Sequence, residues 1–196
     1  FNTPEFIRFI PLHEGGFIPV SLARIDTTSE ESNQLLFGNN QPDAVPKFAL
    51  KRLRPFRKSP YPNIHLFFIV HSDDTEHAKT IKSHFDSGLG TFEGMQNYVD
   101  LYFPTATGFT VVFKNRENPI PEIEQELSKR HFDPEVKYIA IYVTPYSKFE
   151  KDRQKREIYY QLKEILLKRK ITSQAIDPNK MVEQGMNWKY SLPNIA

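Results

Sequence analysis

From Asn63 onward, apolar segments of strand length alternate with segments of helical periodicity. Runs rich in β-branched and aromatic residues fit buried strands, and the segments between them carry apolar residues three or four positions apart. We predict strands over 64–71, 109–113, 138–143 and 173–176, and helices over 75–87, 121–130, 152–170 and from about 192. This order is typical of an α/β fold, with a Rossmann-like parallel sheet of about four strands flanked by helices.

The residues at the predicted helix ends agree with this division. Asp73 or Asp74 can cap the helix over 75–87, and Gly88 can end it. Pro121 stands near the start of the next helix, where a missing backbone N–H costs nothing.

Residues 1–60 follow a different pattern, which predicts a β-rich extension. Segments 6–10 and 17–25 alternate like half-buried strands around a turn at 13–16, and 34–37 fits a further short strand. The run that follows contains prolines at 42, 46, 55, 60 and 62, so we do not expect it to form one regular element. We therefore divide the chain into an extension with a linker, 1–60, and a Rossmann-like domain, 61–196.

The composition narrows the class of protein. The chain has no cysteine, which excludes disulfides and cysteine metal sites and fits a reducing cytoplasm. We see no signal peptide and no apolar run long enough to span a bilayer, so we expect a cytoplasmic protein with no membrane contact. The nearest approach to a metal cluster is His71 with Asp73 and Asp74, which we interpret as a helix cap, so we predict no metal site.

The net charge is only +2, but the charges are unevenly distributed. The segment 47–58 contains six basic residues and no acidic one, and 148–170 contains nine basic against four acidic residues. Basic blocks on an otherwise acidic chain indicate a local site for an anionic partner, or a solvated helix face and a basic loop. For 47–58 we favour a solvated linker over a segment that follows a nucleic-acid backbone, because of its prolines.

Ligands of open parallel sheets bind at the carboxyl ends of the strands, which directs attention to the loop 144–151. The chain has no glycine-rich dinucleotide or Walker-type motif, so an ordinary NAD or ATP site is not expected. In the helix after this loop, Lys155, Tyr159 and Lys163 recur every four residues and share one face. A tyrosine ring can stack on a base and an ammonium can neutralise a phosphate, although such residues singly are more often packing or solvated side chains.

The order Tyr159-xxx-Lys163 followed by Gln174 resembles the guide-binding pocket of the MID domain in Argonaute proteins. The segments 138–145 and 156–163, and the ending 190–196, look like the prokaryotic, bacterial branch of that family. The resemblance covers about Asn63 to Ala196. It implies that this chain holds the 5′-phosphorylated end of a short guide RNA or DNA, as in Argonaute-type silencing or defence.

The resemblance also implies roles for individual residues. Tyr159, Lys163 and Gln174 would bind the 5′ phosphate, and Tyr159 would also stack on the first base. The first-base loop would be Thr144, Pro145, Tyr146 and Ser147, and backbone contacts would come from Lys148, Lys155, Arg156 and Asn194. A further phosphate-binding lysine would follow slightly beyond Ala196.

As a family member, the chain would bind and not cut, because the PIWI nuclease carboxylates are not in it. Its partners would be the guide strand, the PIWI domain of the same parent protein and an effector subunit. No cofactor is expected in this chain, although the family leaves room for a divalent cation at the guide phosphate in a full-length protein. The alternatives from the residues alone are a protein-interaction module on an α/β scaffold and a small-ligand enzyme. The second lacks a nucleophile–base pair.

Overall fold

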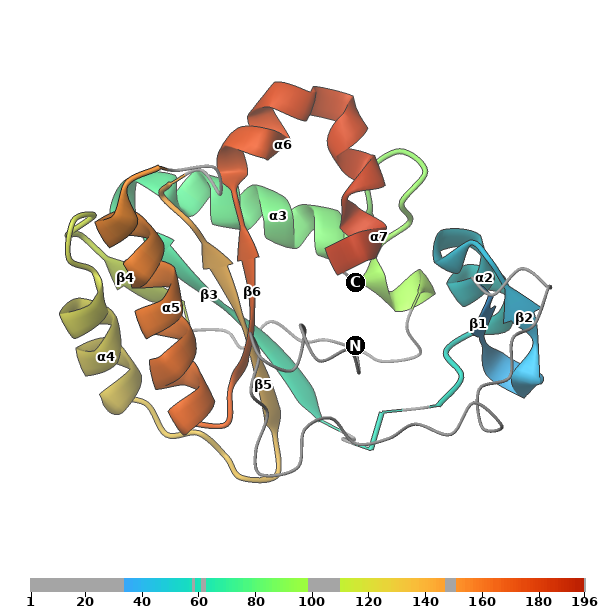
Figure 1. The fold of residues 1–196 in the computed structure, drawn as a ribbon, viewed down its shortest axis with the longest axis horizontal. Coiled ribbons are helices and arrows are strands. Elements are labelled where there is room, and N and C mark those ends of the chain that lie inside the picture. Colours follow the sequence, from blue (N-terminus) through green and yellow to red (C-terminus); the bar gives the residue numbers. More distant parts are fainter. Residues whose placement is uncertain (1–33, 58, 61–62, 99–109, 147–150, 196) are drawn as a thin grey trace, which may run out of the picture. The chain divides into compact units, whose positions relative to one another are not determined.

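Four parallel strands form the central sheet of the computed structural model, in the order β4-β3-β5-β6 (Figure 1). Their bounds are β3 Ile64–His71, β4 Val111–Phe113, β5 Lys137–Val143 and β6 Thr172–Ile176. The structure describes residues 34–57, 59–60, 63–98, 110–146 and 151–195. The parallel sheet flanked by helices confirms the predicted α/β fold class. The strands predicted over 6–10 and 17–25 lie outside the described residues.

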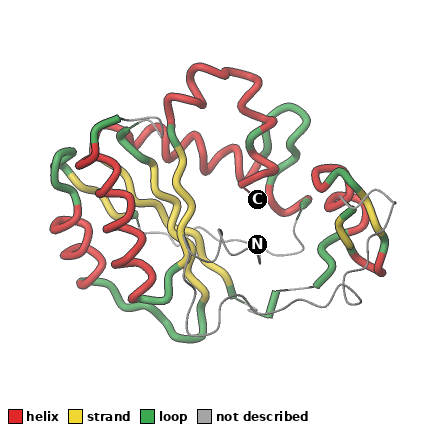
Figure 2. The backbone as a smooth tube through the Cα atoms, in the orientation of Figure 1, coloured by secondary structure: helices red, strands yellow, loops and turns green. Residues whose placement is uncertain are grey.

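Helices connect the strands and follow the last one (Figure 2). Their bounds are α3 Thr75–Ser87, α4 Ile120–Ser128, α5 Arg153–Lys168, α6 Pro178–Gln184 and α7 Leu192–Ile195, and the 3-10 helices are η3 Ser72–Asp74, η4 Met95–Asn97 and η5 Gly185–Tyr190. The predicted helices α3, α4 and α5 are all present, and their ends differ from the prediction by at most two residues. Helices α6 and η5 were not predicted.

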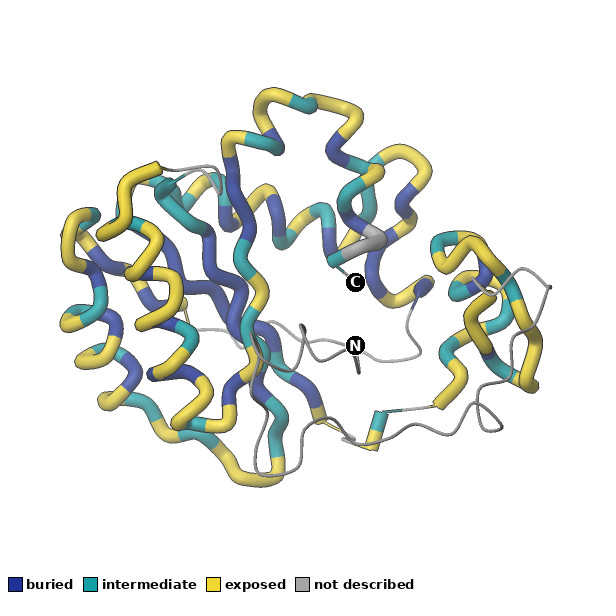
Figure 3. The backbone as a smooth tube through the Cα atoms, in the orientation of Figure 1, coloured by how far each residue is buried: buried dark blue, intermediate teal, exposed yellow. Residues whose placement is uncertain are grey.

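The two faces of the sheet have separate apolar cores, because side chains of a strand alternate between faces. Leu66, Phe68 and Val70 of β3 pack on one face, which we call the α3 face, with apolar residues of α3, η5 and α7. Phe67 and Ile69 pack on the other, which we call the α5 face, with residues of α4 and α5. Strand β3 is therefore buried on both sides, as its unbroken apolar sequence requires (Figure 3).

Local sequence determines where the long helices begin and end. The Asp152 carboxylate accepts a hydrogen bond from the backbone N–H of Gln154 at 2.8 Å and so caps α5. Gly88 ends α3 with φ +84, and a Cβ there would lie 2.2 Å from the Phe92 carbonyl oxygen. Only glycine fits this position, so the predicted stop of α3 is confirmed.

The predicted cap of α3 is only half right. Asp74 occupies the N-cap position, but its side chain makes no capping hydrogen bond. Its carboxylate instead lies 3.3 Å from the guanidinium of Arg116, and the Asp73 carboxylate lies 3.5 Å from the same group. An ion pair with an arginine from the segment after β4 is therefore present where a capping hydrogen bond was expected.

The proline-rich run before the sheet is more ordered than the sequence indicated. Residues Leu35–Ala196 form one compact unit that includes β1 Leu35–Leu36, η2 Gly38–Asn40, β2 Pro42–Asp43 and α2 Pro46–Leu53. Helix α2 corrects our expectation of a solvated linker over 47–58. Pro46 stands in its first turn, where proline is tolerated, and Leu50 packs against the core of the α3 face.

Candidate functional site

A cavity of about 340 Å³ lies beside the carboxyl ends of β5 and β6. One wall is the sheet edge, where Thr144 follows β5 and Gln174 belongs to β6. The other wall is the C-terminal helical segment. The lining residues are Thr144, Gln174, Ala175, Ile176, Asp177, Lys180, Trp188, Ser191 and Ile195. This is the edge at which open parallel sheets bind ligands, and the volume is within the usual range for small-ligand sites.

The lining combines polar side chains with apolar ones. Gln174 contributes an amide, Lys180 an ammonium, and Thr144 and Ser191 hydroxyls. The Asp177 carboxylate caps α6 by accepting from the N–H of Asn179 at 3.0 Å. Trp188 is 3% exposed, and its indole nitrogen has no hydrogen-bond partner among the described residues.

Tyr159 and Lys163 lie one turn apart on α5, as the sequence predicted, and their side chains meet. The Lys163 ammonium lies 5.5 Å from the centroid of the Tyr159 ring, within cation–π range. The same ammonium donates a 2.7 Å hydrogen bond to the carbonyl of Ser173 in β6. Lys163 is therefore fixed against the edge strand of the sheet.

Gln174 follows Ser173 directly, so Lys163 reaches the peptide bond that precedes it. The Gln174 side chain is exposed and donates to the carbonyl of Ala175 at 3.2 Å. The structure thus brings the three predicted phosphate-binding residues to the β6 edge. Of the three, Gln174 lines the cavity, whereas Tyr159 and Lys163 do not.

The loop after β5 is fixed by its own hydrogen bonds. The N–H of Thr144 donates to the carbonyl of Ile176 at 2.9 Å, and the Thr144 hydroxyl bonds to the backbone of Tyr146. The Tyr146 hydroxyl donates to the carbonyl of Arg116 at 2.7 Å. Burial raises the pKa of Tyr146, and the nearby Glu117 carboxylate adds to this. Thr144 lines the cavity, while Tyr146 is held by the segment after β4.

The other predicted contact residues are more dispersed. The Lys155 ammonium lies 4.8 Å from the Tyr146 ring centroid, so it contacts the loop after β5. Arg156 is exposed on the surface of α5, and Pro145 is partly exposed beside Thr144. Ser147 and Lys148 lie outside the described residues, as does the side chain of Asn194 in α7.

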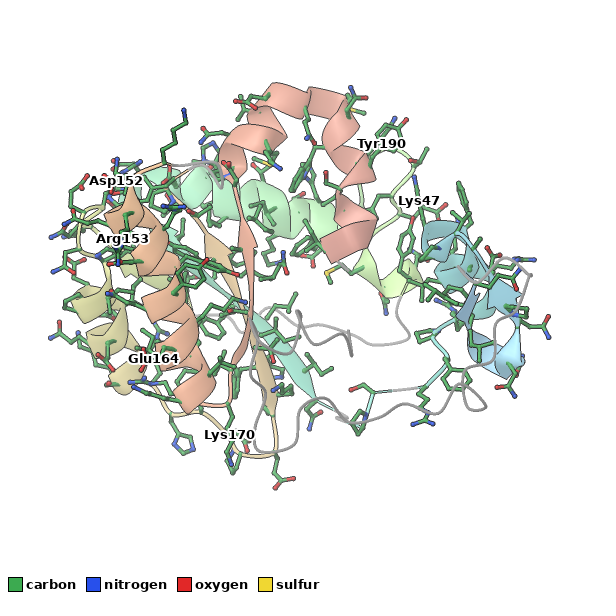
Figure 4. All side chains as sticks on the ribbon, viewed as in Figure 1. Lys47, Asp152, Arg153, Glu164, Lys170 and Tyr190 are labelled. Carbon is green, nitrogen blue, oxygen red and sulfur yellow. The ribbon has the colours of Figure 1, made fainter. Side chains whose placement is uncertain are left out.

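Some of the basic residues on α5 fit the interpretation as a solvated helix face. Arg153 pairs with Glu157 at 2.9 Å, and Lys168 pairs with Glu164 at 2.6 Å. Figure 4 shows Arg153 and Glu164 on this helix. Exposed pairs of this kind contribute little to stability. The basic block therefore includes ordinary surface pairs beside the fixed Lys163.

Sequence reasoning missed the cavity wall formed by Lys180, Trp188 and Ser191. It placed no helix between β6 and α7, although the pair Asp177-Pro178 carries a start signal. Aspartate is a preferred N-cap and proline a preferred first residue, and both have these roles in α6. No local signal shows that Trp188 would turn toward the sheet.

The histidine at the end of β3 is used in packing the strand end. Its Nδ1 accepts from the N–H of Asp73 at 3.2 Å, and its Nε2 lies 2.8 Å from the carbonyl oxygen of Lys114. Both ring nitrogens of His71 are thus engaged by the backbone. Among the described residues, no group of three or more histidine or carboxylate side chains is placed to hold a metal ion.

Comparisons with known proteins bear on the fold. No protein-family model matches the chain, and a search of curated proteins finds no match either. Among solved structures, the chain is similar to the Argonaute protein from Methanocaldcoccus janaschii, with a TM-score of 0.56 and 15% sequence identity. The chain has an Argonaute-like fold. The similarity covers 83% of this chain and 24% of the archaeal one, so the chain spans about a quarter of that protein.

The helices give one further result, which concerns membranes. Within the part of the chain that the structure describes, none of them has both the length and the apolar character of a bilayer-spanning segment.

Proposed function

We propose that this chain is a MID-type module that binds the 5′-phosphorylated end of a short guide RNA or DNA. The observation that carries the proposal is the placement of Tyr159, Lys163 and Gln174 at one edge of a sheet whose fold is Argonaute-like. This edge adjoins a cavity of about 340 Å³ whose lining includes Gln174 and Thr144. In this role the chain binds and does not cut, and acts with a PIWI domain and an effector subunit in an Argonaute-type silencing or defence protein.

The contacts of Lys163 suit a phosphate ligand. An ammonium has three donors, and one of them is engaged by the Ser173 carbonyl. Two donors remain, on a group whose direction the sheet already determines. A terminal phosphate carries close to two negative charges at neutral pH, so it gains charge-assisted hydrogen bonds that a 5′ hydroxyl does not.

Tyr159 suits the first base. Its ring is 37% exposed, and its neighbour on the helix surface is the Lys163 ammonium. An exposed ring beside a cation is the arrangement on which single-stranded nucleic acids stack their bases. Gln174 and Thr144, from the neighbouring strand and loop, add polar groups on the cavity side.

The test is a titration with single strands that carry either a 5′ phosphate or a 5′ hydroxyl, read by fluorescence anisotropy. We expect the phosphate to raise affinity by at least about tenfold, the range of a charge-assisted hydrogen bond. Lys163→Ala should remove this preference. Lys168→Ala deletes an exposed lysine from the same helix, which pairs with Glu164, and should leave the preference unchanged.

Equal binding of the two strands would count against the proposal, provided that a version extended past Ala196 by about one helix also fails to discriminate. The extension matters because the resemblance expects a further phosphate-binding lysine there. A preference that survives Lys163→Ala would instead move the phosphate site away from the β6 edge.

A further inference from the structure

A second aromatic and basic cluster lies where α2 meets η5. We call Lys47, Phe48, Lys189 and Tyr190 the α2–η5 surface. The Lys47 ammonium lies 4.9 Å from the Tyr190 ring centroid and 5.6 Å from that of Phe48. The Lys189 ammonium lies 5.1 Å from the Tyr190 centroid. Two segments far apart in sequence thus place two lysines around one tyrosine ring, and Figure 4 labels Lys47 and Tyr190.

Lys47 and Lys189 differ from the other basic residues in α2 and directly after it, which have polar partners within the chain. Lys51 pairs with Glu93, Arg52 with Asp43, and Arg54 donates to the carbonyl of Asn97. Among the described residues, Lys47 and Lys189 have no carboxylate within ion-pair distance, and their ammonium groups lie against aromatic rings. Two positive charges without a counter-charge beside them favour an anionic ligand.

The rings of this surface are open to solvent. Phe48 is 66% exposed and Tyr190 is 54% exposed, so neither ring is used to fill the core. A cation–π contact at an exposed site is weak, and an incoming base can displace it because base–aromatic stacking is stronger. The displaced lysine can then turn to the adjoining phosphate. The surface therefore offers what single-stranded nucleic acid needs: rings for bases and cations for the backbone.

The position of Lys189 depends on a glycine in the loop after α3. A Cβ on Gly90 would lie 2.8 Å from Cδ of Lys189, so the lysine stem passes directly over this residue. Gly90 also has φ +58, a conformation that glycine adopts without strain. The bare backbone at Gly90 thus leaves room for Lys189 beside Tyr190.

The same helix, η5, contributes to the α2–η5 surface and to the cavity. Helix η5 carries Trp188, which is buried and lines the cavity, and then Lys189 and Tyr190. The next residue, Ser191, lines the cavity again. Residues three apart share a face of a 3-10 helix, so Trp188 and Ser191 face the cavity while Lys189 and Tyr190, between them, project from η5 in other directions.

We propose that the α2–η5 surface binds single-stranded nucleic acid at nucleotides beyond the first one, which the proposed function places at the β6 edge. A base stacks on Tyr190 or Phe48 while Lys47 and Lys189 contact backbone phosphates. The assignment of these nucleotides to the guide strand rests on the proposed function, whereas the binding of a single strand to the surface does not.

The test compares strand lengths on the full chain. The probes are a 5′-phosphorylated dinucleotide and 5′-phosphorylated and 5′-hydroxyl strands of about ten nucleotides, within the range covered by single-strand binding sites. We expect Tyr190→Ala to weaken binding of the longer strands about fivefold or more, since stacking is worth at least that factor, and to leave the dinucleotide unaffected. Tyr190→Phe keeps the ring and should restore binding.

The charge of the surface is tested separately. Lys47→Ala with Lys189→Ala should also lower affinity for the longer strand alone, and Lys129→Ala, at an exposed lysine directly after α4, should not. Circular dichroism checks that each variant is folded. Unchanged binding of the longer strand by Tyr190→Ala and by the double variant would overturn this inference.

The preference of the wild type for a 5′ phosphate is measured independently of the effects of the Tyr190 and lysine substitutions. If long strands bind through Tyr190 but wild type ignores the phosphate, the proposed function fails and this surface stands. If the phosphate matters but Tyr190 and the two lysines do not, the proposed function stands and this surface fails. Equal losses on the dinucleotide and the long strand would also overturn the inference, because they would place Tyr190 in the first-nucleotide site.

Discussion

Two lysine–tyrosine pairs in this protein have similar geometry and different surroundings. Lys163 lies 5.5 Å from the Tyr159 ring, and Lys47 lies 4.9 Å from the Tyr190 ring. Lys163 also donates to a strand carbonyl at 2.7 Å, which fixes its direction. The Lys47 ammonium, within the part of the chain that the structure describes, lies against the Phe48 and Tyr190 rings alone. The first pair is held by the sheet, and the second can rearrange.

This difference suggests two kinds of binding. A fixed ammonium loses little freedom when it meets a phosphate, so it suits recognition of one group in one place. An ammonium between two exposed rings can follow a flexible strand, at the cost of ordering its side chain. The β6 edge therefore suits the chemically unique end of a strand, and the α2–η5 surface suits its repeating part.

The largest contrast is expected from charge reversal. Lys163→Glu places a carboxylate beside the Ser173 carbonyl and the proposed phosphate, and should lower affinity for a 5′-phosphorylated strand by about two orders of magnitude. It should also lower the melting temperature, because an acceptor replaces a donor. Lys47→Glu should weaken only longer strands, by about tenfold, with no change in melting temperature. Titration and thermal melts of both variants decide whether the two lysines differ in this way.

Loss of the Tyr159 ring should have a smaller effect than charge reversal of Lys163, and it should affect only the first base. Tyr159→Ala should weaken 5′-phosphorylated strands of every length by about five- to a hundredfold, the worth of one stacked base. Tyr159→Phe should bind nearly as well as wild type, since the ring is retained. The measurement is the ratio of affinities for the dinucleotide and the longer strand. A ratio that changes in Tyr159→Ala would mean that this ring stacks a base other than the first.

The contact between Tyr159 and Lys163 could be predicted from the sequence because it depends only on the spacing of residues along one helix. Tyr159 and Lys163 are four residues apart, and a helix of known register determines that they meet. The strands and helices from β3 to β6 were predictable for a similar reason, since burial on one or two faces leaves a periodic pattern. The Gly88 stop added its own local signal.

The second pair could not be predicted in this way. Lys47 and Tyr190 meet only because α2 docks through Leu50 and because η5 turns Tyr190 outward. The prolines around α2 indicated a linker, and tertiary contacts overrode that local preference. The cavity wall formed by Lys180, Trp188 and Ser191 was missed similarly, since the segment that carries these residues has no clear apolar periodicity. Arg116, which pairs with the Asp73 and Asp74 carboxylates before α3, lies in the segment after β4.

Salt dependence separates the two surfaces by the number of phosphates that each neutralises. For single strands, each phosphate that a lysine neutralises adds about 0.7 to the steepness of log affinity plotted against log salt. Lys47→Ala with Lys189→Ala should therefore flatten the slope for a longer strand by about 1.4, and should not change it for the dinucleotide. An unchanged slope for the longer strand would show that these lysines stay on their rings when the strand is bound.

The smallest expected effect is a difference in pH dependence. A terminal phosphate has a second pKa of about 6, whereas internal phosphodiesters stay singly charged throughout this range. If Lys163 prefers the dianion, binding lowers that pKa, and the affinity gained is present above it and lost as the pH falls. Between neutral pH and about pH 5 the dinucleotide should then lose less than about tenfold in affinity. The contribution of Lys47 and Lys189, taken as the ratio of wild type to the double variant on the longer 5′-phosphorylated strand, should stay constant. Burial lowers the pKa of His84, so acid also destabilises the fold, and circular dichroism at each pH must show the chain folded. A ratio that falls with the dinucleotide affinity would mean that both lysine–tyrosine pairs act on the same terminal phosphate.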